Sequence, residues 1–126
     1  MRIEHLNLSV SDLEASLAFY GELLGWGVRW RGQAQGAAGP VEAAHLGDEA
    51  CYLALFQAEA AADEGPDSRY SQPGVNHVGF VVDDLDQTLA RLSKLGPKVH
   101  FQPEYDPGRR AYFFDADGIE VELIEY

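Results

Sequence analysis

The feature that most constrains this chain is a repeated pattern whose two copies lie 72 residues apart. Residues 4–13 read Glu-His-Leu-Asn-Leu-Ser-Val-Ser-Asp-Leu, and residues 76–85 read Asn-His-Val-Gly-Phe-Val-Val-Asp-Asp-Leu. At this offset His5 matches His77 and Asp12 matches Asp84. Apolar and capping positions can recur through shared secondary structure alone, but a histidine at the same point of a strand is harder to explain in that way. The repeat indicates that one supersecondary unit is used twice.

Each copy predicts a strand followed by a helix. Apolar residues alternate with polar ones through Leu6, Leu8 and Val10, which is typical of a strand with one buried face. Ser11 or Asp12 can cap the helix that follows, and Gly25 ends it. In the second copy Asp83 or Asp84 caps the helix, and Gly96-Pro97 ends it.

Three short extended stretches separated by Gly or Pro turns follow each helix. We place them at about 26–33, 40–47 and 50–57 in the first copy, and at about 98–103, 109–115 and 118–125 in the second. The chain is therefore predicted to be a single α+β domain, 1–126, built from two tandem βαβββ modules. Module one covers about 1–57, an acidic connection about 58–73, and module two about 74–126.

Charge and composition exclude several classes of function. A net charge of −12 argues against binding to nucleic acid or to anionic membranes. No apolar run approaches the roughly 20 residues that span a bilayer. The N-terminus carries no signal-peptide pattern, so we expect a cytoplasmic protein. Cys51 is the single cysteine, and its apolar surroundings predict a buried, inert thiol.

Three ionisable residues are predicted on the faces of their strands that point away from the helices. His5 and His77 alternate with the apolar residues of the first strand in each module. Glu122 alternates in the same way with Val121 and Leu123 of the last strand. If both modules surround one cavity, the three converge, and two imidazoles with one carboxylate form a facial set for a divalent transition metal. The alternative is that these are structural or surface residues, and spacing alone leaves both open.

At these residues the chain resembles the vicinal oxygen chelate superfamily, which includes glyoxalase I, extradiol dioxygenases, fosfomycin-resistance enzymes and bleomycin-binding proteins. The resemblance covers essentially the whole chain. Its matching pieces are His5–Val10 with Asp12-Leu13, residues 18–26 (Ala-Phe-Tyr-Gly-Glu-Leu-Leu-Gly-Trp), residues 76–80, and residues 114–125 around Asp117-Gly118 and Glu122.

The resemblance implies an incomplete barrel around one divalent metal ion (Fe, Mn, Zn or Ni), with His5, His77 and Glu122 in the family's ligand positions. It also implies a homodimer, because family modules pair within or between chains and half-barrels leave sheet edges exposed. The four-ligand glyoxalase pattern has a further ligand on the last strand of module one. Aligning residues 53–56 with residues 121–124 puts Ala54 there, which resembles the three-ligand members instead.

Several other side chains are candidates for the site. Tyr112 precedes Glu122 by ten residues and could donate a hydrogen bond to an oxyanion, or pack on the sheet. His100, and with less support His45, could be a general base, although strand histidines are usually structural. Arg109 and Arg110 could bind a substrate carboxylate or be solvated, and Trp30 could line the cavity or pack in the core.

These observations leave several functions open. The leading hypothesis is a metal-dependent enzyme that binds two neighbouring oxygens of a small-molecule substrate and runs dioxygenase or lyase/isomerase chemistry. The alternative is a drug- or metabolite-binding protein of the bleomycin-resistance kind without turnover, and such binders typically lack the ligand triad. A metal-binding sensor is a third possibility.

Overall fold

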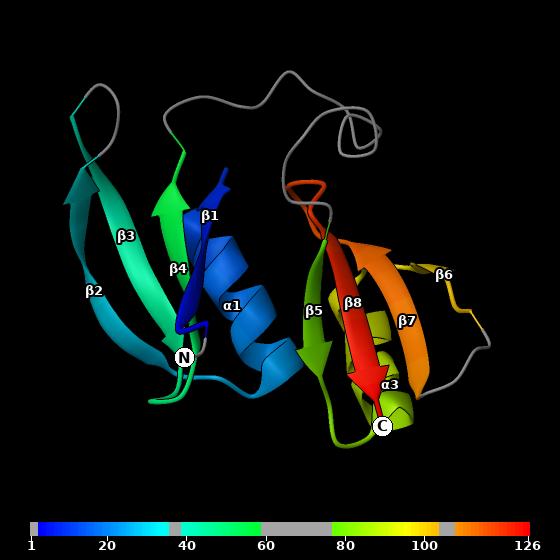
Figure 1. The fold of residues 1–126 in the computed structure, drawn as a ribbon. Helices are drawn as coiled ribbons and strands as arrows, with labels where there is room; N and C mark the ends of the chain where they lie inside the picture. Colours follow the sequence, from blue (N-terminus) through cyan, green and yellow to red (C-terminus); the bar gives the residue numbers. More distant parts are fainter. Residues whose placement is uncertain (1–2, 36–38, 59–76, 104–107) are drawn as a thin grey trace. The chain divides into compact units, whose positions relative to one another are not determined.

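The chain forms two compact units, which are described one at a time: residues Met1–Ala62 and Asp63–Tyr126. The structure is a computed structural model and describes residues 3–35, 39–58, 77–103 and 108–126. In its described residues each unit has one helix and one four-stranded sheet in the order βαβββ (Figure 1). The α+β class and the repeated βαβββ module are therefore confirmed.

The sheet of the first unit has the strand order β1-β4-β3-β2. Strands β1 and β4 are parallel, and the other neighbours are antiparallel. Helix α1 packs against β3 and β4 on one face of this sheet. The elements are β1 (His5–Val10), α1 (Leu13–Leu24), β2 (Val28–Gln35), β3 (Pro40–Gly47) and β4 (Tyr52–Gln57).

The sheet of the second unit has the matching order β5-β8-β7-β6. Its first and last strands, β5 and β8, are again parallel, and α3 packs against β8. The elements are β5 (Val78–Val81), α3 (Leu85–Leu95), β6 (Val99–Phe101), β7 (Arg109–Phe114) and β8 (Glu120–Glu125). No helix in the described residues is long and apolar enough to cross a membrane.

The predicted caps start and stop both helices. Asp12 accepts a hydrogen bond from the backbone N–H of Ala15 at 2.9 Å, and Asp84 accepts one from Gln87 at 2.8 Å. These carboxylates satisfy N–H groups that the first helical turn leaves without a partner. Gly25, at φ 69°, ends α1 in the left-handed conformation that glycine adopts at low cost.

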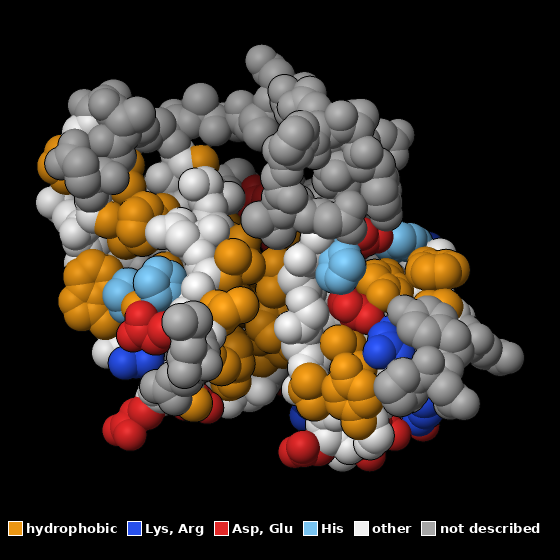
Figure 2. Space-filling view, viewed as in Figure 1, with side chains coloured by type: hydrophobic (Ala, Val, Ile, Leu, Met, Phe, Trp, Pro, Cys, Tyr) orange, Lys and Arg blue, Asp and Glu red, His pale blue; other side chains and the backbone are white. Residues whose placement is uncertain are grey.

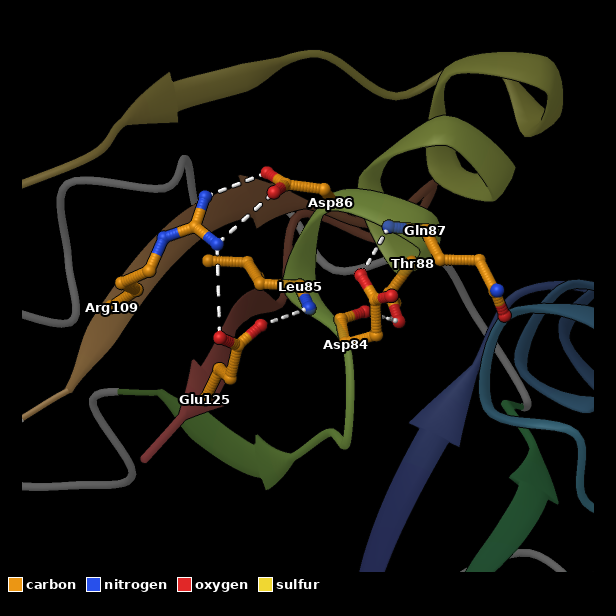
Figure 3. Close-up of polar contacts among 7 residues, drawn as sticks. All are labelled: Asp84, Leu85, Asp86, Gln87, Thr88, Arg109 and Glu125. Atoms are coloured by element: carbon orange, nitrogen blue, oxygen red, sulfur yellow. Dashed lines mark hydrogen bonds and ion pairs between the residues drawn. The ribbon is translucent and has the colours of Figure 1, made fainter.

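Each helix is also fastened to the last strand of its sheet. Gln57 Oε1 accepts a hydrogen bond from the N–H of Leu13 at 2.9 Å, and Glu125 Oε2 accepts one from Leu85 at 2.6 Å. Gln57 and Glu125 occupy equivalent ends of β4 and β8. Figure 3 shows this contact in the second unit, beside Asp84 and its bond to Gln87. The contact joins the sheet to the point where the helix begins.

Each sheet buries the face that carries the helix. On β1 the side chains of Leu8 and Val10 are buried, while His5, Asn7 and Ser9 are exposed. Directly paired residues on neighbouring strands point to the same face of a sheet. The register therefore assigns each residue of the other strands to the helix-packed face or to the opposite face. The face opposite the helix is called the open face. Other buried residues lie on the strands of each unit: Leu46, Leu53 and Leu55 in the first, and Ala111, Phe113, Val121 and Leu123 in the second.

Cys51 is exposed, so the prediction that it is buried is wrong. It lies in the turn between β3 and β4, where Asp48 Oδ1 accepts hydrogen bonds from the N–H groups of Ala50 and Cys51. This Asp turn holds residue 51 outside the sheet. The strand that was expected from residue 50 therefore begins at Tyr52.

We predict that Glu125→Ala lowers the free energy of unfolding by about 1 kcal/mol, because it leaves the Leu85 N–H without its acceptor. Glu125→Gln is the matched control, since Gln57 makes the same contact with an amide in the first unit. Urea denaturation followed by circular dichroism measures both. Equal losses in the two variants would show that the charge of Glu125, and not its acceptor oxygen, stabilises the helix.

Candidate metal and substrate site

Glu122 is the centre of a polar cluster on the open face of the second unit. Its side chain is 9% exposed. Its Oε1 accepts a hydrogen bond from the Tyr112 hydroxyl at 2.7 Å and lies 3.1 Å from Arg110 Nε. Its Oε2 lies 3.1 Å from His77 Nε2. We call Arg110, Tyr112, His77 and Glu122 the Glu122 cluster.

The register of the sheet assembles this cluster. Tyr112 pairs directly with Glu122 across β7 and β8, and Gly79 pairs with Glu122 across β5 and β8. Tyr112 therefore shares the open face with Glu122, whereas its neighbour Phe113 is fully buried. Glycine at position 79 leaves the space beside Glu122 Oε2 without a side chain, since a Cβ there would lie 3.4 Å from that oxygen.

In the second unit two of the proposed ligand atoms are close enough to share one metal ion. Two ligand atoms that each lie about 2.1 Å from one ion, at a right angle, are about 3 Å apart. The 3.1 Å between His77 Nε2 and Glu122 Oε2 matches that spacing. Tyr112 and Arg110 both engage Oε1. His77 instead contacts the other carboxylate oxygen, Oε2.

The first unit presents His5 on a row of aromatic rings. The ring of His5 stacks on Tyr52 with centroids 4.9 Å apart, and Tyr52 stacks on His45 at 4.5 Å. Trp30 completes the row at 4.7 Å from His45. We call these four side chains the ring row. Figure 2 shows histidines of this unit at the surface beside hydrophobic side chains.

The strand alignment that excluded a fourth ligand agrees with the register. Ala54 pairs with Asn7, as Glu122 pairs with Gly79, and Asn7 and Gly79 are equivalent in the repeat. Ala54 is therefore the counterpart of Glu122. By the same comparison His45 is the counterpart of Tyr112, and Trp30 that of Phe101.

The proposed triad draws His5 from the first unit and His77 and Glu122 from the second. Among the described residues, no three His, Cys, Asp or Glu side chains form a group that could hold a metal ion. The triad as a whole stays a prediction. What the structure supplies is the paired geometry of His77 with Glu122 and the open-face position of His5.

His100 has a buried partner that the sequence analysis did not identify. Its Nε2 lies 2.9 Å from Glu120 Oε1, and Glu120 is 4% exposed. The imidazole stacks on Phe114 at 4.5 Å and 10°. Glu120 shares the parity of Glu122, so alternation along β8 was the signal that could have found it.

The two adjacent arginines have different surroundings. The Arg110 side chain is 11% exposed and contacts Glu122 on the open face. Arg109 is half-exposed and donates two hydrogen bonds to Asp86 at the start of α3, with Glu125 at 3.7 Å (Figure 3). The hydrogen bonds from Arg109 hold the pKa of the Asp86 carboxyl below its usual range. Arg110 thus lies beside the proposed ligand, and Arg109 beside the helix.

His45 has an altered pKa. Burial lowers it, and the positive charges of Arg29 and of His5, when protonated, lower it further. The imidazole of His45 is therefore neutral at pH 7, because its pKa lies below the ordinary value of about 6.5. A neutral ring packs between Tyr52 and Trp30 without the desolvation cost of a cation.

With fold and site described, the chain can be compared with known proteins. Residues 2–123 match the family model described as the Glyoxalase/Bleomycin resistance protein/Dioxygenase superfamily. The chain belongs to this superfamily. It is 31% identical to the glutathione transferase FosA of Serratia marcescens, over 96% of this chain and 78% of that protein.

Two solved structures are similar to the chain. One is a glyoxylase/bleomycin resistance protein/dioxygenase domain from Frankia sp. EAN1pec, with a TM-score of 0.81 and 27% identity over 99% of this chain and 91% of that one. The other is a mutant of the fosfomycin resistance protein FosX from Listeria monocytogenes, complexed with Mn(II) and 1S,2S-dihydroxypropylphosphonic acid. Its TM-score is 0.73 with 18% identity, over 98% of this chain and 88% of that one, and it shows a shared fold.

We predict that Arg110→Met lowers the free energy of unfolding by about 3 kcal/mol, because it leaves the buried carboxylate of Glu122 without its guanidinium. Arg109→Met is the matched control and should cost clearly less, since that ion pair is exposed and solvent screens it. Chemical denaturation of both variants gives the comparison. Equal costs would show that Glu122 does not depend on Arg110.

Proposed function

We propose that this chain is a metal-dependent enzyme that binds one divalent ion through His5, His77 and Glu122. The observation that carries the proposal is the 3.1 Å contact between His77 Nε2 and a glutamate oxygen on an open sheet face. The ion (Fe, Mn, Zn or Ni) would supply a Lewis acid to which two neighbouring oxygens of a small substrate bind. The Mn(II) bound to the related FosX supports this class of metal.

The side chains around the ligands have distinct proposed roles. Arg110 and Tyr112 hold Glu122 through Oε1, which directs Oε2 toward His77. Tyr112 is the candidate donor of a hydrogen bond to a substrate oxygen beside the proposed ligand, to which its single hydroxyl proton would turn from Glu122 Oε1. His100, oriented by Glu120 and Phe114, is the candidate general base. Arg109, Arg110 and Trp30 stay candidates for substrate binding.

The reaction is proposed only to the level of dioxygenase or lyase/isomerase chemistry. Ala54 stands where a fourth protein ligand would lie, which favours a three-ligand metal site over the four-ligand glyoxalase I arrangement. The second candidate function is binding of a drug or metabolite without turnover. The exposed indole of Trp30 is the feature that favours it, since an aromatic surface suits ring-bearing ligands.

The test is metal analysis of protein purified without chelators, followed by titration of the metal found. We expect one ion per chain in the wild type. His5→Ala, His77→Ala and Glu122→Ala should each abolish tight binding, because two remaining ligands rarely hold a labile ion. Cys51→Ala is the matched control, as an exposed thiol outside the proposed site.

Full occupancy in one of the three variants would remove that residue from the site. A substrate screen with the identified metal then separates enzyme from binder. Turnover that falls in Tyr112→Phe or His100→Gln, with metal content unchanged, supports the enzyme. Ligand binding with no turnover across the screen supports the binder instead.

We also propose that the protein is a homodimer. In the described residues each sheet ends in outer strands that pair on one side only, namely β1 and β2 in one sheet and β5 and β6 in the other. Such edges are usually covered by another element or chain. Light scattering at micromolar concentration should give twice the chain mass of 13.9 kDa, and a mass of one chain would contradict the proposal.

A further inference from the structure

The ring row holds His5 by stacking on one side. The planes of His5 and Tyr52 are 20° apart, and those of Tyr52 and His45 are 30° apart. Tyr52 therefore packs between two imidazoles that come from β1 and β3. Aromatic pairs favour particular ring geometries and stabilise each other beyond the area that they bury.

Without this packing His5 has little to orient it. Its side chain is 42% exposed, and its other contact is Glu4, whose Oε2 lies 3.1 Å from Nδ1. Glu4 is itself 59% exposed, and an exposed pair of this kind contributes little orientation. When Nδ1 carries the proton and donates it to Glu4, Nε2 presents its lone pair for coordination.

The far end of the row is fixed by its surroundings. The indole of Trp30 lies against Gly32, where an added Cβ would come within 2.5 Å of Cζ2. The guanidinium of Arg29 lies 4.6 Å from the centroid of Tyr52 and donates a hydrogen bond to the carbonyl of Asp48. Trp30 at one end of the ring row is thus packed against the strand at Gly32, and Tyr52 in the row contacts the Arg29 cation.

The two units orient their proposed ligands by different means. In the second unit, a hydrogen bond from Tyr112 and an ion pair with Arg110 hold Glu122. In the first unit His45 stands where the second has Tyr112, and it packs instead of donating to a carboxylate. The orientation of His5 therefore depends on ring contacts.

We propose that Tyr52 is a positioning residue that, by stacking, holds the His5 imidazole with Nε2 free for a metal ion. The inference rests on the proposed function, because His5 matters in this way only as a ligand. The aromatic ring of Tyr52 carries the effect, and its hydroxyl does not.

The experiment compares Tyr52→Thr, which removes the ring from a strand position, with Tyr52→Phe, which keeps it. Isothermal titration with Mn(II) and with Zn(II) should show about tenfold weaker binding for Tyr52→Thr, as for loss of other residues that orient a ligand. Tyr52→Phe should bind as the wild type does. Equal affinity of Tyr52→Thr and wild type, or equal weakening in both variants, would overturn the inference.

A second measurement is independent of metal. The chain has four histidines, so their ring protons can be assigned by single substitutions. In metal-free wild type the His5 ring protons should be shifted upfield by Tyr52 and should give nuclear Overhauser contacts to it. The shift should persist in Tyr52→Phe and vanish in Tyr52→Thr.

These arms separate the two proposals. If neither ion binds to the wild type, the proposed function fails, while the proton spectra still decide whether Tyr52 holds His5. If the ions bind but wild-type His5 shows no contact to Tyr52, the positioning role is overturned and the metal site stands. The wild-type spectrum also decides the matter if Tyr52→Thr does not fold.

Discussion

The arrangement of each unit depends on parallel pairing between its first and last strands. The pairing of β5 with β8 sets Gly79 opposite Glu122, which leaves His77 diagonal to that carboxylate at the edge of the open face. Shifting the register by one residue would turn Glu122 into the helix-packed layer, where a carboxylate has no partner. The same pairing in β1 and β4 places His5 directly opposite Tyr52. Both groups of open-face residues thus follow from the one backbone interaction.

The two copies of the repeat keep the same backbone arrangement but differ in the side chains at equivalent positions. Equivalent positions carry an amide in Gln57 and a carboxylate in Glu125, and both accept from the first N–H of a helix. On the open faces the substitutions are larger, since Ala54 stands for Glu122 and His45 for Tyr112. A helix start requires an acceptor of any charge, whereas a ligand position requires a particular atom. The differences between the two copies therefore lie mainly on the face opposite the helix.

Parity and capping could be predicted from the sequence because they depend on neighbours close along the chain. Asp12, Asp84 and Gly25 were identified in this way, and so was the position of His5 on the face opposite the helix. The contacts of Arg109 with Asp86 could not be predicted, because they join residues 23 apart through the rotamer of a long side chain.

The packing of Tyr52 on His5 was missed for a related reason. It requires the register of two strands and the rotamers of two rings, which a single sequence does not specify. The prediction that Cys51 is buried was wrong because an Asp turn, and not the apolar run after it, decides where β4 begins. The proposed triad takes residues from both units, and strand parity within one unit does not establish it.

The close approach of Trp30 to Gly32 has a consequence for comparing relatives. A side chain at position 32 would tip the indole off the strand and away from His45, so the row would end one ring earlier. Tryptophan followed two residues later by glycine on the second strand is therefore a mark by which chains with a complete row can be sorted from those without one. This sequence pattern can be recognised in relatives whose structures are not known.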